Sequence, residues 1–127
     1  MSMPEIMSEV HSHGVPRVTV TGGEPLAQRD ALTLMDTLVN EGYEVSIETS
    51  GAHSISGINP QVSVVMDLKT PGSGESHRNL MENIALLKRS DQVKFVITDR
   101  EDYDWSRFQV DALALDDRVD DILFSPS

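Results

Sequence analysis

The chain has 127 residues, a net charge of −11 and no cysteine. This length is that of one domain and is short for a complete α/β barrel, which takes about 200 residues or more. The acidic balance argues against binding to a nucleic-acid backbone, and the absence of cysteine excludes disulfides, thiolate zinc sites and cysteine-held iron–sulfur clusters within these residues.

No run of about 18 apolar residues and no basic-then-apolar leader is found, so the sequence predicts no membrane contact and a cytoplasmic location.

Helical and strand-like periods alternate along the chain. Ser2 and Glu5 form a capping box that predicts a first helix, and Gly14 ends it. The run from Val62 to Asp67 is almost continuously apolar, which is typical of a buried parallel strand. The expected helices cover residues 2–13, 27–41, 78–89 and 104–113, and the expected strands cover residues 17–21, 45–48, 62–67, 92–97 and 121–124. This pattern predicts a single α/β domain over residues 1–127.

The residues that follow the predicted strands share a polar character. Most of these segments also contain a small residue that lets a ligand approach the backbone. They are residues 21–25, 48–51, 67–72, 98–100 and 125–127. Strands separated by helices pair in parallel through right-handed crossovers, and ligands of such sheets gather at the carboxyl ends of the strands. The sequence therefore predicts a small-molecule site at that edge of the sheet.

The segment from Thr21 to Pro25 is the clearest candidate for ligand contact. Gly22 and Gly23 allow positive φ and close approach of the backbone, and Glu24 can accept hydrogen bonds from an ammonium group. A plain strand-to-helix turn is the alternative interpretation. The segment lacks the lysine and Ser/Thr of a phosphate-binding loop.

A strand that ends in Gly22-Gly23-Glu24-Pro25 resembles a motif of radical S-adenosylmethionine enzymes, where it meets the amino group of the methionine moiety. Residues 45–51, 66–74 and 92–97 are similar to segments of the 7-carboxy-7-deazaguanine synthase family within that group. The resemblance covers nearly the whole chain. It implies a parallel-stranded partial (β/α) barrel of the radical S-adenosylmethionine type that lacks its first strand, so that this chain would be the middle of such an enzyme.

The resemblance implies binding roles for ten residues but names no catalytic residue and no metal ligand. The residues expected to bind the substrate are Thr21, Glu48 and Ser125. The residues expected to bind S-adenosylmethionine are Gly22, Gly23, Glu24, Ser50, Asp67, Leu68 and Lys69. Most relatives have Ser-Pro-Lys where this chain has Asp67-Leu68-Lys69. Two alternatives stand beside these roles: an ion pair from Glu48 to Lys69 or Lys94, and a loop-capping role for Asp67.

The family converts 6-carboxy-5,6,7,8-tetrahydropterin to 7-carboxy-7-deazaguanine, a precursor of queuosine. The resemblance implies a lyase that uses S-adenosylmethionine, Mg²⁺ and a [4Fe–4S] cluster held by three cysteines, and a homodimer for the complete enzyme. Since this chain has no cysteine, we expect it to be inactive alone. We also expect residues 17–21 to form a free sheet edge that promotes self-association.

Two other interpretations stand beside a fragment of the enzyme. One is a cluster-free module that binds S-adenosylmethionine, and the other is a subunit of a split enzyme completed by a cysteine-bearing chain. Tyr103, Trp105 and Phe108 follow helical spacing and are expected in the core.

Overall fold

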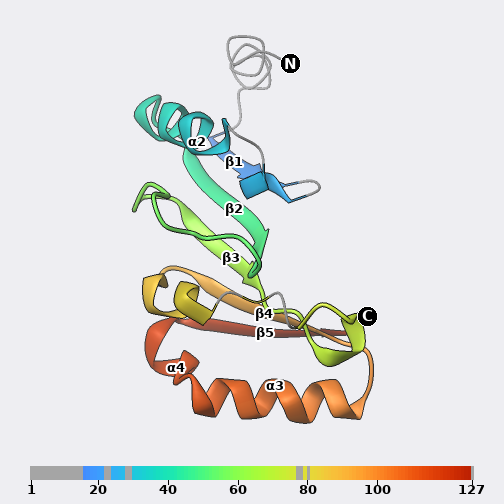
Figure 1. The fold of residues 1–127 in the computed structure, drawn as a ribbon. Helices are drawn as coiled ribbons and strands as arrows, with labels where there is room; N and C mark the ends of the chain where they lie inside the picture. Colours follow the sequence, from blue (N-terminus) through green and yellow to red (C-terminus); the bar gives the residue numbers. More distant parts are fainter. Residues whose placement is uncertain (1–15, 22–23, 28–29, 77–78, 80, 127) are drawn as a thin grey trace.

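The structure is a computed structural model, and it describes residues 16–21, 24–27, 30–76, 79 and 81–126. Within these ranges five strands form one sheet, all neighbouring pairs are parallel, and the strand order follows the chain order (Figure 1). The strands are β1 (Arg17–Val20), β2 (Glu44–Ser50), β3 (Ser63–Asp67), β4 (Gln92–Ile97) and β5 (Asp121–Pro126). The predicted α/β class with a parallel sheet is thus confirmed. The helix expected over residues 2–13 lies outside the described residues.

One face of the sheet belongs to the hydrophobic core. Along β2, Val45, Ile47 and Thr49 are buried, whereas the residues between them are half-buried or exposed. The same alternation buries Val64 and Met66 on β3. Because successive side chains of a strand point to opposite faces, the core takes one face and leaves polar side chains on the other.

The segments between the strands cover the core face. In Figure 1, α2 lies beside the β1 end of the sheet and α3 beside the β5 end, and the two helices contact β2 and β4 respectively. The segments are η1 (Pro25–Ala27), α2 (Ala31–Asn40), η2 (Pro71–Ser73), η4 (Met81–Leu86), α3 (Arg100–Ala112) and α4 (Leu115–Arg118). Met35 and Leu38 of α2 and Ile84 of η4 belong to the core cluster.

The helix expected over residues 78–89 is wrong for most of its length, since the described part holds only the short 3₁₀ helix η4. Polar side chains redirect the backbone there. Asn83 turns inward, where its amide is fully buried. Asp91 accepts a hydrogen bond from the Lys88 amide at 2.9 Å, which forms a turn before β4. These bonds replace the helical ones that periodicity predicts.

The boundaries of α3 also differ from the expectation. The helix starts before residue 104: it covers Arg100–Ala112 and is capped by Asp99, whose side chain accepts a hydrogen bond from the Asp102 amide at 2.9 Å. Asp104 instead pairs with Arg100 at 3.0 Å one turn earlier. The expectation that Tyr103 and Phe108 lie in the core is wrong.

Two of the three aromatic residues on α3 face outward, since Tyr103 is 39% and Phe108 67% exposed. The buried stripe of this helix consists of Asp102, Ser106 and Val110. Trp105 alone packs against the core, edge-on to Phe95 with 6.3 Å between ring centroids. The side of α3 that faces the core thus carries two polar residues, where the helical spacing predicted aromatic ones.

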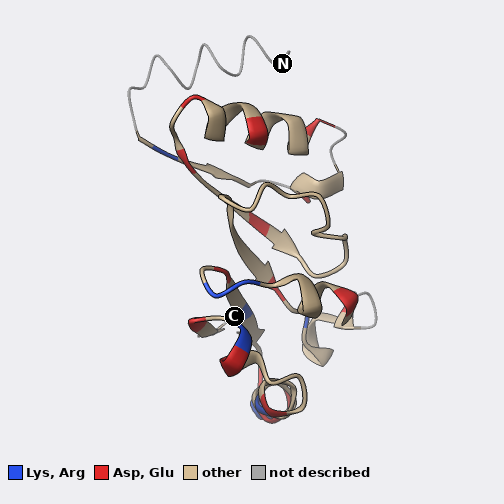
Figure 2. Cartoon of the chain, turned by 90° about the vertical axis from the view of Figure 1, so that its left-hand side faces the viewer, with Lys and Arg blue, Asp and Glu red and all other residues tan. Residues whose placement is uncertain are grey.

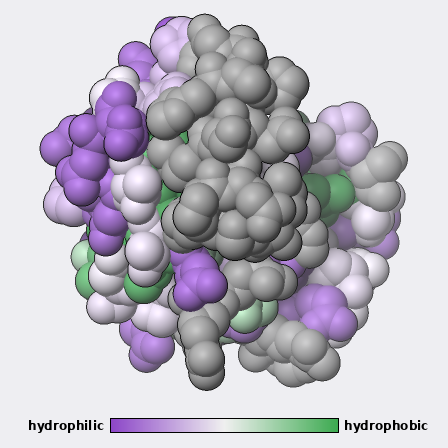
Figure 3. Space-filling model, turned by 90° about the horizontal axis from the view of Figure 1, so that it is seen from above, coloured by the Kyte–Doolittle hydropathy of each residue, from purple (hydrophilic) through white to green (hydrophobic). Residues whose placement is uncertain are grey.

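The surface is acidic over several elements rather than in one patch. Figure 2 shows acidic residues on α2, on the strands and in loops, with few basic ones. From above, the coloured part of the surface is mainly pale or purple, with small separate hydrophobic areas (Figure 3). Within the described ranges no helix is long and apolar enough to span a membrane.

Candidate functional site

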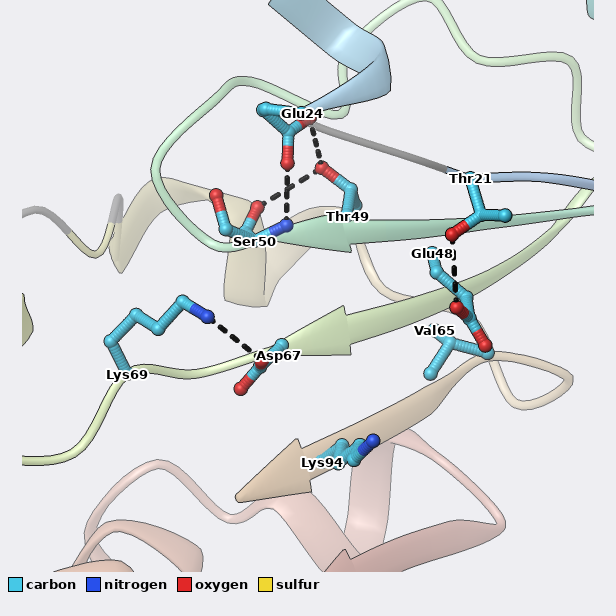
Figure 4. Close-up of a pocket in the computed structure, with 9 residues that line it drawn as sticks. All are labelled: Thr21, Glu24, Glu48, Thr49, Ser50, Val65, Asp67, Lys69 and Lys94. Carbon is cyan, nitrogen blue, oxygen red and sulfur yellow. Dashed lines mark hydrogen bonds and ion pairs between the residues drawn. The ribbon is translucent and has the colours of Figure 1, made fainter. Parts of the chain in front are cut away.

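A pocket of about 370 Å³ opens at the carboxyl ends of β1 to β4, on the face opposite the core (Figure 4). This volume is in the usual range for small-molecule sites, about 300–1,000 Å³. The lining residues are Thr21, Glu24, Glu48, Thr49, Ser50, Val65, Asp67, Lys69 and Lys94. The sequence-based prediction of a polar site at this edge of the sheet agrees with this position.

The strand register arranges the lining residues in rows across the sheet. Glu48 of β2 pairs with Val65 of β3, and Ser50 pairs with Asp67 one step further along. Asp67 in turn pairs with Lys94 of β4. Because the strands are parallel and in register, residues two apart on each strand face the same side, and their side chains meet above the sheet.

Glu24 joins the turn after β1 to the end of β2. Its carboxylate accepts hydrogen bonds from the Ser50 amide at 2.7 Å, the Thr49 hydroxyl at 2.7 Å and the Leu26 amide at 2.8 Å. Burial raises the pKa of Glu24, but the hydrogen bonds from Ser50, Thr49 and Leu26 outweigh it and lower the pKa below its ordinary value. Glu24 is therefore held ionised and fixed at the rim of the pocket.

Glu48 and Asp67 provide the other two carboxylates. The Thr21 hydroxyl donates to Glu48 Oε2 at 3.2 Å, and Lys69 Nζ forms an ion pair with Asp67 Oδ2 at 2.9 Å. The second oxygen of Asp67, Oδ1, is buried and has no hydrogen-bond partner among the described residues. Neither ion pair considered for Glu48 is formed: Lys69 pairs with Asp67, and Lys94 makes no ion pair with a described residue.

Two asparagines hold the loops that follow β2 and β3. Asn79 Oδ1 accepts from the Lys69 amide and Asn79 Nδ2 donates to the Lys69 carbonyl, both at 3.0 Å. Asn83 of η4 accepts from the Ile55 amide at 3.0 Å and donates to the His53 carbonyl at 2.8 Å. The backbone of both loops is thereby fixed next to the pocket.

Of the ten residues with predicted binding roles, the structure describes eight. Six of them line the pocket: Thr21, Glu24, Glu48, Ser50, Asp67 and Lys69. Leu68 points the other way and is 1% exposed in the core, and its amide donates to the Lys94 carbonyl. Ser125 lies on the pocket face of β5, paired with Val96, but is not among the lining residues. Gly22 and Gly23 lie outside the described residues.

Lys94 lines the pocket although the sequence analysis assigned it no binding role. Its signal was present in the alternation of β4, where buried Val93 and Phe95 flank it. A charged residue between two buried ones faces the side opposite the core. Thr49 and Val65 were missed as well, and neither carries a charge that would have marked it.

Metal and cluster ligands do not gather in the part of the chain that the structure describes. No group of three or more His, Asp or Glu side chains there could hold a metal ion. The sequence contains no cysteine. The carboxylates, hydroxyls and lysine amines that line the pocket can bind a polar organic molecule through hydrogen bonds and ion pairs.

No family model matches the chain. A 7-carboxy-7-deazaguanine synthase of Koribacter versatilis is 40% identical over 129 aligned positions, which cover 100% of this chain and 57% of that protein. The chain resembles 7-carboxy-7-deazaguanine synthases over its full length. The synthase of Thermoplasma acidophilum is 40% identical over 91 positions, 70% of this chain and 44% of that protein. The synthase of Chlorobaculum tepidum is 33% identical over 110 positions, 84% of this chain and 50% of that protein.

The resemblance to 7-carboxy-7-deazaguanine synthases that the strand-end motifs indicated is thereby confirmed. The chain spans about half the length of the curated synthases it matches: 57%, 44% and 50% of the three described above. The similarity extends over the same strands and loops that build the pocket.

Proposed function

We propose that this chain is part of a 7-carboxy-7-deazaguanine synthase of the radical S-adenosylmethionine type. The pocket would contribute to the site that binds S-adenosylmethionine and 6-carboxy-5,6,7,8-tetrahydropterin. The observation that carries the proposal is the position of the polar pocket at the carboxyl ends of the strands, in a chain similar to such synthases over its full length. Open parallel α/β sheets bind their ligands at this edge.

The lining residues suit S-adenosylmethionine in their chemistry. Its ammonium and ribose hydroxyls need acceptors, and the carboxylates of Glu48 and Asp67 face the pocket. Asp67 Oδ1 is buried without a partner among the described residues, so a ligand donor would satisfy it. Lys69, fixed through its backbone by Asn79, keeps the Asp67 carboxylate in place. In a complete enzyme of this type, S-adenosylmethionine together with the cluster would supply the hydrogen-abstracting chemistry, and these residues would hold and orient it.

The chain does not fit the iron–sulfur cluster of the family. Thiolate ligands are needed for it, and the sequence has no cysteine. Among the described residues, no group of three or more His, Asp or Glu side chains could hold a metal ion. We therefore propose that this polypeptide alone has no synthase activity and that its own residues bind and orient ligands.

Calorimetric titration of the chain with S-adenosylmethionine tests the proposal. We expect measurable binding that falls about tenfold or more in Asp67→Asn, because a neutral amide loses the charged hydrogen bond to the ligand. Asp116→Asn on α4 is the matched control, since this exposed carboxylate lies outside the pocket. Equal affinities in all three proteins, or no binding to the unchanged chain, would refute the assignment of this pocket.

The proposed inactivity needs a separate assay. The anaerobically prepared chain, supplied with iron, sulfide, reductant, S-adenosylmethionine and the tetrahydropterin, is expected to form no 7-carboxy-7-deazaguanine by mass spectrometry. Detection of the product would overturn this part of the proposal while leaving the binding site intact.

A further inference from the structure

Lys94 projects from β4 into the pocket, in the same cross-strand row as Ser50 and Asp67. It pairs in register with Asp67. Glu48 pairs with Val65, two residues before Asp67 on β3, and therefore lies in the neighbouring row. Figure 4 shows Lys94 below Asp67 and Val65, with no interaction drawn to its amine. Two of the chain's three lysines, Lys69 and Lys94, therefore line one pocket.

The carboxylates of the pocket already have donors within the chain. Glu24 accepts three hydrogen bonds from the backbone and from Thr49. Asp67 Oδ2 pairs with Lys69, and Glu48 Oε2 accepts from Thr21. No ion pair joins any of these three described carboxylates to the Lys94 amine, and Figure 4 draws none.

Lys94 is unusual among the basic residues that the structure describes. Six others form an ion pair or hydrogen bond with a described residue: Arg17, Lys69, Lys88, Arg89, Arg100 and Arg118. Arg107 forms neither, but it is exposed on α3 and fully hydrated. Lys94 is half-buried, so it has lost part of its hydration without gaining a counter-charge.

We infer that Lys94 binds the carboxylate of the pocket's ligand. An ammonium group that is half-buried and unpaired gains a charge-assisted hydrogen bond when a carboxylate arrives. A singly charged group suits the surroundings better than a phosphate, since Glu48 and Asp67 flank the position and repel additional negative charge. The inference rests on the proposed function for its two candidate ligands: the carboxylate belongs either to the pterin or to the methionine moiety of S-adenosylmethionine.

Matched pairs of probes distinguish the two sources. The first pair is pterin-6-carboxylate and 6-methylpterin, and the second is S-adenosylmethionine and 5′-methylthioadenosine. In each pair only the first probe has the carboxylate. We expect Lys94→Gln to weaken the binding of one carboxylate probe about tenfold to hundredfold and that of its partner less than about twofold. The pair that responds identifies the source of the carboxylate.

Two further variants control for charge and packing. Lys94→Arg keeps the cation and is expected to retain most of the affinity. Arg107→Gln removes the same charge from the exposed surface of α3 and is expected to change nothing. The inference is wrong if Lys94→Gln leaves both carboxylate probes unaffected, if it weakens both members of a pair equally, or if Arg107→Gln has the same effect.

A measurement with a simple dicarboxylate separates this inference from the proposed function. In the chain labelled with ¹³C at lysine Cε, the Lys94 signal is identified by its loss in Lys94→Arg. On titration with succinate we expect this signal to shift while that of Lys88, already paired with Asp91 at 2.7 Å, does not. If no pterin and no adenosyl probe binds but the shift occurs, the proposed function fails and the anion site stands. If the Lys94 signal stays unchanged with every carboxylate, the anion site is refuted.

Discussion

Asp102 is a carboxylate placed in the interior to tie two segments together. It is 0% exposed and accepts hydrogen bonds from the Thr98 amide at 3.0 Å, the Thr98 hydroxyl and the Gly72 amide at 2.7 Å. A Cβ atom at Gly72 would meet the Thr98 hydroxyl and the Asp102 carboxylate, so only glycine fits there. The loop that follows Lys69 is thus fastened to the start of α3.

The pKa of Asp102 gives this contact a pH dependence. The Thr98 hydroxyl has the largest effect; burial opposes it, and the amides of Thr98 and Gly72 add to it, so that the pKa falls to about 2. A carboxyl pKa lowered by folding stabilises the folded state above the ordinary value, about 3.9. This stabilisation is lost as the pH falls through the folded value.

Asp102→Asn is therefore expected to lower the thermal unfolding midpoint at neutral pH. Asparagine has one side-chain oxygen, so at least one of the donors on Gly72 and Thr98 would face its NH₂ group and lose its acceptor. The difference from the unchanged chain should narrow as the pH falls from about 4 to about 2. Thermal unfolding followed by circular dichroism across this range measures both effects. Asp36→Asn on the exposed side of α2 should leave the midpoint unchanged. A difference that grows toward acid pH would contradict the assigned role.

At the scale of elements, Asn83 of η4 and Asn79, two residues before η4, bind both loops that border the pocket. Asn83 is fully buried and binds the loop after β2, and Asn79 binds the backbone of Lys69 after β3. The two asparagines lie four residues apart, yet only Asn83 belongs to η4, so they do not share a helix face. Both side chains form hydrogen bonds with backbone groups of the loops, and no apolar side chain can form such bonds.

Asn83→Ala is expected to reduce the free energy of unfolding by about 1–3 kcal/mol, because the buried Ile55 amide loses its acceptor. Urea denaturation measures this change. Asn79→Ala should have a smaller effect on unfolding but speed hydrogen exchange at the Lys69 amide. Asn40→Ala at the exposed end of α2 serves as the control for both. An Asn83→Ala protein as stable as the control would show that the loop after β2 is held by other contacts.

The sequence predicted the strands more accurately than the helices. The apolar alternation of β2, β3 and β4 reflects burial against one core face, and burial follows side-chain polarity directly. In η4 and α3 the deciding contacts come from Asn83, Asp99 and Asp102, whose partners lie elsewhere in the fold. Propensity and spacing contain no information on such partners.

The same distinction applies to the site. Residues at strand ends, such as Thr21 and Asp67, could be predicted because parallel topology brings all strand ends together. The alternation of β4 indicates the face on which Lys94 lies, but its place beside Asp67 in the pocket depends on the register of β4 with β3. Register is a property of two segments at once, so it cannot be read from either alone.

At the scale of the whole molecule, the sheet is open. β1 and β5 are the outer strands of the sheet in the described part of the chain, and apolar side chains lie exposed near β5. Leu123 is 43% and Phe124 37% exposed. An outer strand with apolar surface promotes pairing with other chains. The expected self-association at residues 17–21 remains a prediction, and β5 provides a second edge for it.

Leu123→Lys is expected to reduce self-association of the chain, because a charged side chain on an outer strand disfavours edge-to-edge pairing. Sedimentation velocity over a wide range of concentration measures the effect. Leu86→Lys, which adds the same charge at an exposed position of η4, is the control. If the unchanged chain is a monomer at every concentration, or if both variants change its association equally, β5 is not the edge through which the chains associate.

The agreement between strand order and chain order has a consequence for how the chain folds. Each strand pairs only with the strands immediately before and after it in sequence, so no pairing has to wait for a distant segment. Closing a short loop costs less conformational entropy than closing a long one, and local topologies fold faster. The sheet can therefore grow one strand at a time from any adjacent pair, and the rows that carry Glu48, Asp67 and Lys94 need only the pairs β2–β3 and β3–β4, without either outer strand.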